Sequence, residues 1–144
     1  MPTAADAAAI NDAIVLELEE ASAQMAAFYA DPYPEASTLI SLESTLMATA
    51  DRVRKIRDYR GDASLQEEAL AILAFYQRLC QETNRSLLDL TTAAYYTVED
   101  SLLTQRVLAV ILVEEHRRNQ RFLAIQDSFA VQYGILLVAE PYVP

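Results

Sequence analysis

The stretch with the most reactive side chains is residues 114–121, which reads Glu-Glu-His-Arg-Arg-Asn-Gln-Arg and contains the only histidine, His116. A di-iron site in a helical bundle requires a Glu three residues before a His on each of two helices. Val113 occupies that position here. One histidine and one cysteine are also too few for a closed zinc site. The sequence therefore predicts no metal site and no other cofactor.

Nucleophilic catalysis is also poorly supported by the sequence. The single imidazole lies in a charged stretch, and two isolated glycines cannot form a phosphate-binding loop. Cys80, the only cysteine, lies on an amphipathic stretch, where we interpret it as a small buried hydrophobic residue. Glu114 and Glu115 could still act as an acid and a base if other carboxylates face them. Because no catalytic signature is present, we predict that the protein is not an enzyme and has no catalytic residues.

The reactive stretch belongs to a longer segment, residues 98–133, that contains no proline and no glycine. At roughly 1.5 Å per residue, such a segment predicts a helix of about 50 Å. One stripe of this helix has the three- and four-residue spacing that keeps side chains on a single face. The stripe is apolar at both ends and polar in the middle, and consists of Leu108, Leu112, Glu115, Asn119, Phe122, Ile125, Phe129 and Tyr133.

Three amphipathic segments precede the long helix, and local signals mark where they begin and end. Pro32 stops the first, Gly61 closes the second, and a Ser-Leu-Gln-Glu capping box at Ser64 starts the third. Thr97 caps the fourth. We expect one all-α domain over residues 1–144, an up-down-up-down antiparallel four-helix bundle with a short non-helical C-terminal tail. Its helices should span about 4–30, 35–59, 62–91 and 98–133, with the tail at 134–144.

The polar middle of the long helix needs polar partners if it points into the bundle, because an unpaired buried charge costs about 3–5 kcal/mol. Glu115, Arg118 and Asn119 form the candidate layer on this helix. Their partners by height along the bundle would be Asp51 and Arg54 on the second helix, or Gln77 and Thr83 on the third. We interpret the layer as a hydrogen-bonded set that fixes helix register, and a ligand site is the alternative.

The net charge of the chain excludes one class of partner. With 21 acidic and 11 basic side chains, the chain carries a formal charge of -10. This field repels phosphate backbones, so we predict no nucleic-acid partner.

The apolar runs are too short for a transmembrane segment, and residues 1–6 do not have the pattern of a signal peptide. The apolar residues 135–138 should fold over the bundle or bury themselves in another subunit, which would make a homo-oligomer.

Several short motifs, spread over nearly the whole chain, resemble those of a known family. They are Asn-Asp-Ala-Ile-Val at 11–15, Gly61-Asp62, Ala69 with Phe75-Tyr76, and Phe122, Gln126, Phe129 and Tyr133-Gly134. With these motifs the chain resembles a family of small bacterial surface proteins, often lipoproteins, that fold as four-helix bundles without an established activity. The resemblance implies a location in the cell envelope and supplies no catalytic residues. The chain departs from the family in its acidity and in lacking an export signal and a lipidated cysteine.

Three functions follow from these observations as hypotheses. The first is a non-enzymatic envelope or surface protein, a structural or protein-binding module that presents a helix face or the Tyr95-Tyr96 end to a protein partner. The second is a small-ligand carrier or enzyme that uses the polar layer. The third is a cytosolic adaptor or homo-oligomer that buries the apolar tail.

Overall fold

The computed structural model describes residues 2–93 and 95–137, and within them the regular structure is helical apart from one isolated bridge between Tyr59 and Asp62. The all-α class predicted from the sequence is therefore confirmed for this part of the chain. Most of the predicted tail lies outside the described residues. The helices are α1 (Ala4–Ala30), α2 (Ala36–Lys55), α3 (Ser64–Gln81), α4 (Thr83–Thr91) and α5 (Val98–Tyr133).

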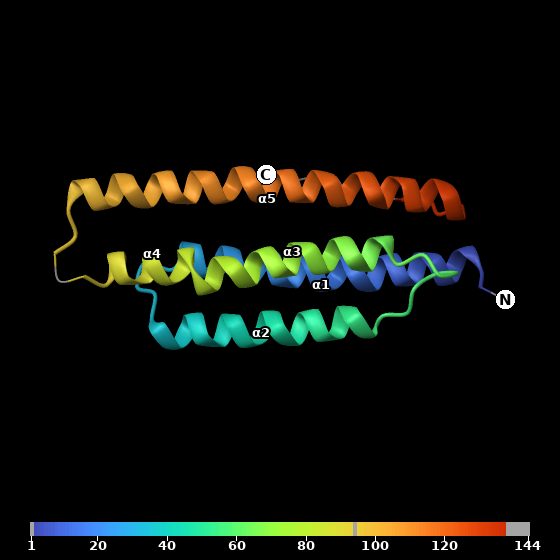
Figure 1. The fold of residues 1–144 in the computed structure, drawn as a ribbon, viewed down its shortest axis with the longest axis horizontal. Coiled ribbons are helices and arrows are strands. Elements are labelled where there is room, and N and C mark those ends of the chain that lie inside the picture. Colours follow the sequence, from blue (N-terminus) through green and yellow to red (C-terminus); the bar gives the residue numbers. More distant parts are fainter. Residues whose placement is uncertain (1, 94, 138–144) are drawn as a thin grey trace.

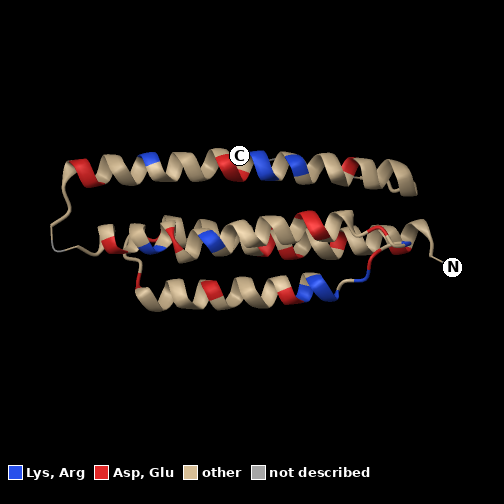
Figure 2. Cartoon of the chain, viewed as in Figure 1, with Lys and Arg blue, Asp and Glu red and all other residues tan. Residues whose placement is uncertain are grey.

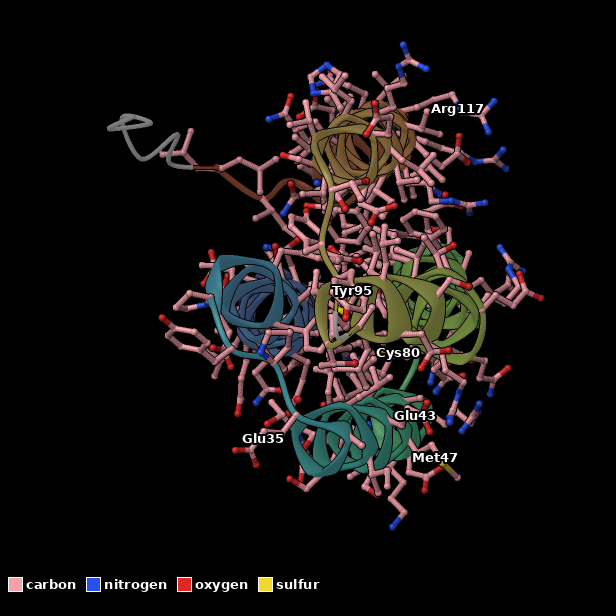
Figure 3. All side chains as sticks on the ribbon, turned by 90° about the vertical axis from the view of Figure 1, so that its left-hand side faces the viewer. Glu35, Glu43, Met47, Cys80, Tyr95 and Arg117 are labelled. Atoms are coloured by element: carbon pink, nitrogen blue, oxygen red, sulfur yellow. The ribbon has the colours of Figure 1, made fainter. Side chains whose placement is uncertain are left out.

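The helices lie along one long axis, and α4 continues the line of α3 (Figure 1). Seen from one end, α2 and α5 occupy opposite sides of the molecule, with α1 and α3 between them (Figure 3). The closest packing is between α2 and α3, whereas α5 packs mainly on α3 and only sparsely on α1. The fifth helix is thus the least enclosed of the long helices.

The third predicted helix is interrupted at one residue, Glu82, whose backbone has φ -113° and ψ -76°. The Glu82 amide still donates to the Arg78 carbonyl at 3.0 Å, and the Ser86 amide donates to the Glu82 carbonyl at 3.2 Å. These two hydrogen bonds span the break and keep α3 and α4 in line. The predicted continuous helix over 62–91 is therefore two helices with a shared direction.

The second helix is shorter than predicted because a side chain from α3 caps its end. The Gln66 amide donates to the carbonyls of Val53, Arg54 and Ile56, at 2.9 Å in each case. These are carbonyls at the end of a helix, where partners within the helix run out. The helix accordingly ends at Lys55, not near residue 59.

Local capping chemistry explains two of the helix starts and fails at a third. Thr97 caps α5 and forms a reciprocal capping box with Asp100, and Thr3 and Asp6 form a second capping box at α1. The capping box predicted at Ser64 does not form, because Ser64 is already the first helical residue and donates its amide to Asp62 Oδ1 at 2.9 Å.

The core lies mainly between α1, α2 and α3, while α5 contributes Ile111, Phe122, Phe129 and Ala130 as its buried residues. Near the end of α5 an aromatic cluster holds it in place. The Tyr59 ring lies 4.6 Å from the Tyr133 ring between centroids, and Phe129 lies 4.7 Å from Tyr133. The Tyr133 hydroxyl donates to Asp62 Oδ2 at 2.7 Å. Among residues 2–93 and 95–137, no comparable aromatic cluster anchors the first half of α5.

Candidate functional site

The five residues predicted to form a polar core layer do not come together. Asn119 is exposed on α5, so the prediction that it points inward is wrong. Asp51 and Arg54 are also exposed, on α2, and pair with each other at 2.7 Å. Because α2 lies on the side of the molecule opposite α5 (Figure 3), neither residue can serve α5 as a partner.

The remaining two members of the predicted layer, Glu115 and Arg118, are partly buried against α3 and do not pair with each other. The Arg118 guanidinium lies over the Phe75 ring, 4.7 Å from its centroid. Its Nε is 3.2 Å from Glu114 Oε1 but makes no hydrogen bond there, so this contact is electrostatic only. Arg118 thus links α5 to α3 through Phe75, and with Glu114 it also lines an open pocket of about 220 Å³.

Burial raises the pKa of Glu115 above its usual value of 4.5. The folded state therefore keeps the Glu115 proton to a higher pH than the unfolded state does. The free energy of unfolding falls as the pH rises from the unfolded pKa through the folded pKa. Replacing Glu115 by glutamine should stabilise the protein near pH 7 and have no such benefit near pH 4. Urea unfolding at both pH values tests this, with the exposed Asp127→Asn on the same helix as control. An equal gain at both values would contradict the explanation from burial of the charge.

Two polar pairs that the sequence reasoning missed do connect the helices. The Gln126 amide on α5 donates to Asn11 Oδ1 on α1 at 2.8 Å. The Tyr29 hydroxyl on α1 donates to Asn84 Oδ1 on α4, also at 2.8 Å. Asn11 and Asn84 are buried, and each has its side-chain oxygen satisfied by its partner, so the pairs are structural. A signal for Asn11 was present in its spacing, four residues after Ala7 and three before Ile14, both on the buried face of α1.

The unusual surface of the molecule is the first half of α5. Beyond Val98 in the first turn, five large apolar side chains there are between 49% and 71% exposed, and we call them the α5 outer face: Leu102, Leu103, Val110, Leu112 and Val113. Figure 2 shows this half of α5 largely without charge, between an acidic first turn and the charged stretch in the middle of the helix. The sequence-based stripe placed Leu112 in the core, and this assignment is wrong.

A sequence signal for the α5 outer face was present in residues 107–113, which read Val-Leu-Ala-Val-Ile-Leu-Val. Seven consecutive apolar residues cover nearly two turns of a helix, so they occupy all of its sides. Only one side can face the core of a bundle. Some of these residues must therefore be exposed or covered by another molecule.

Shallow grooves border α5 on both sides. The groove toward α3 has about 450 Å³ of space over an apolar floor that includes Phe75, Leu79 and Val110, and Arg106 and Glu114 also line it. The groove toward α1 has about 250 Å³ and includes Leu18, Tyr76 and Phe122. Both are open to solvent, so they extend the apolar surface around α5 and do not enclose a small molecule.

The predicted partner surface, Tyr95 and Tyr96, lies in the connection between α4 and α5 at one end of the molecule (Figure 3). Tyr95 is 88% exposed and Tyr96 is about half exposed. The Tyr96 hydroxyl and Thr104 Oγ1 lie 3.3 Å apart, which ties this tyrosine to the start of α5. Tyr96 thus contacts the start of α5 on the side that faces α1 and α4, and the role of both tyrosines in binding stays a prediction.

The chemistry of the other candidate groups is limited. Cys80 is buried, and burial raises the pKa of its thiol to about 11, so the thiol is protonated near neutral pH. Within residues 2–93 and 95–137, no group of three or more His, Cys, Asp or Glu side chains is placed to hold a metal ion. Among the described helices, none combines the length and the apolar character needed to span a bilayer.

No family model, no curated protein and no solved structure matches this chain, so its resemblance to bacterial surface proteins stays a prediction.

Proposed function

We propose that this chain is a non-enzymatic helical module that binds a protein through the α5 outer face. The observation that carries the proposal is the exposure of the five large apolar side chains on one half of one helix. Exposed apolar surface of this kind costs free energy in water and commonly marks a site of association. A protein partner would remove that cost by covering the face.

The spacing of the exposed residues favours a helical partner. Leu103, Val110 and Val113 follow one another at seven and three residues, with Arg106 between the first two, so they form a ridge along α5. Ridges with this spacing fit the grooves of another helix. The charge of -10 argues against a nucleic-acid partner, because it repels the phosphate backbone.

For the topology we propose an up-down-up-down antiparallel bundle, in which α3 and α4 together form the third helix. The support is the short connections, residues 31–35, 56–63 and 92–97, each of which is too short to return the chain to the opposite end. A location at the bacterial envelope follows only from the resemblance of the motifs and is proposed on that basis.

A photo-crosslinking amino acid at Val110 should give adducts with a discrete protein in cells of the source organism. The same amino acid at Met47 is the matched control, because Met47 is similarly exposed but lies on α2, on the opposite side of the molecule (Figure 3). Adducts from position 110 and none from position 47 would support the proposal. Identical adducts from both positions, or none from either, would contradict it.

A further inference from the structure

We infer that the partner of the α5 outer face is a second copy of this chain, packed antiparallel with α5 against α5. The inference rests on the proposal that this face binds protein, and it names the partner. It is carried by the order of charges and apolar residues along one exposed line of the helix.

That line, the α5 seam, has spacings of four, three, four, three and four residues, which is the heptad spacing of paired helices. Every residue in it is exposed, so the seam is free to meet another helix. It begins with an acid, ends with a base, and has apolar residues on both sides of one central arginine. Its members are Glu99, Leu103, Arg106, Val110, Val113 and Arg117.

A parallel pair of helices would place each seam residue opposite its own copy. Glu99 would then face Glu99, Arg106 would face Arg106, and Arg117 would face Arg117, and these three like-charge contacts are unfavourable. The net charge of -10 on each chain adds long-range repulsion, which makes a self-complementary contact necessary. The charges of the seam therefore disfavour the parallel arrangement.

An antiparallel pair about a twofold axis near the height of residue 108 removes all three conflicts. Glu99 then faces Arg117 of the other copy at both ends of the seam, and Leu103 faces Val113 twice. Arg106 faces Val110, where its aliphatic stem can cover apolar surface while the charge reaches solvent. A twofold interface requires this kind of self-complementarity, in which one surface matches itself when it is turned around.

Arg117 is available for such a pair although it already contacts an acid. Its Nη2 lies 2.7 Å from Glu114 Oε1, three residues earlier on the same helix, and the arginine side chain is 74% exposed. Exposed pairs of this kind contribute little to stability. A carboxylate from a second copy can therefore share or replace Glu114 at little cost.

The test exchanges the charges at the two ends of the seam. E99R or R117E alone should weaken dimerisation about tenfold or more, because each places like charges at both ends. An equimolar mixture of the two variants should restore the wild-type affinity, because each variant then supplies the charge that the other lacks. Analytical ultracentrifugation over a concentration series measures all four samples.

The matched control for E99R is E67R, which replaces an exposed acid in the first turn of α3 by a base. Both variants reverse a charge near a helix N-terminus, so their effects on the helix dipole are the same. It should leave the dimer unchanged. Circular dichroism confirms that each variant folds, and the mixture serves as a check that neither substitution harms the monomer.

Two results would overturn the inference. A wild-type chain that is monomeric up to its solubility limit would exclude the second copy, and a mixture no stronger than the single variants would exclude the antiparallel arrangement. The protein-binding proposal fails separately. A monomer that still gives adducts with another protein from position 110 overturns only the inference, whereas a monomer without such adducts overturns both.

Discussion

Truncating Ile111 to alanine should lower the free energy of unfolding by about 2–5 kcal/mol, whereas truncating Leu112 should change it by no more than about 0.5 kcal/mol. These two neighbours on α5 have nearly equal side-chain volume and differ in placement. Ile111 is 4% exposed and belongs to the core, while Leu112 is 66% exposed. The contrast measures directly which side of α5 faces the bundle.

Denaturant unfolding of both variants at low protein concentration is the measurement, so that association does not add to stability. Similar losses at the two positions would mean that α5 is rotated from its place in the structure. The α5 outer face would then be partly buried, and the basis for a binding surface would be lost. A large loss of stability at Ile111 alone would show that the side of α5 that carries Ile111 faces the core, whether or not a partner binds.

The sequence predicted the helices well where local chemistry sets their ends. Thr97 supplies the capping box of α5, and Gly134 ends the helix with φ 70°, a conformation that glycine adopts easily. In α2 the inward face is also clear from the sequence, because a single apolar face alternates with polar residues there. Leu39, Leu42, Leu46 and Val53 on that face are all buried.

The face of α5 could not be predicted in the same way. In residues 107–113 every position is apolar, so periodicity admits more than one inward stripe, and both Ile111 and Leu112 fit one. The choice is made by tertiary packing on α3. The same limit applies to α2, where Gln66 sets the end of the helix from a position 10 to 13 residues away from the carbonyls that it caps.

The polar site was mispredicted for a related reason. Asn119 lies within the charged stretch 114–121, on a stripe that was predicted to face inward, whereas Asn84 lies where the third predicted helix breaks. Its partner, Tyr29, is 55 residues away in the sequence. A hydrogen bond of that range depends on how two helices meet, and no spacing within one helix indicates it. Sequence periodicity therefore located the helices but not the polar contacts between them.

Replacing Asn84 by aspartate should destabilise the protein by about 3–5 kcal/mol near pH 7, while Asn119→Asp should cost no more than about 0.5 kcal/mol. Asn84 is fully buried, accepts from the Tyr29 hydroxyl at 2.8 Å, and has its amide nitrogen 3.5 Å from Cys80 Sγ. An aspartate at position 84 still accepts the hydrogen bond from the Tyr29 hydroxyl. Its negative charge, however, is buried with no cation beside it. Asn119 is exposed, so the same charge stays in water.

The loss at position 84 should also depend on pH in a defined direction. Burial raises the pKa of the introduced carboxyl in the folded state above its unfolded value of about 4. Stability is then lost as the pH rises through that interval and regained as it falls, because the protonated acid is neutral and has nearly the shape of asparagine. Urea unfolding at several pH values measures this recovery. A loss that persists at low pH would mean that the geometry at Asn84, and not the buried charge, causes the effect.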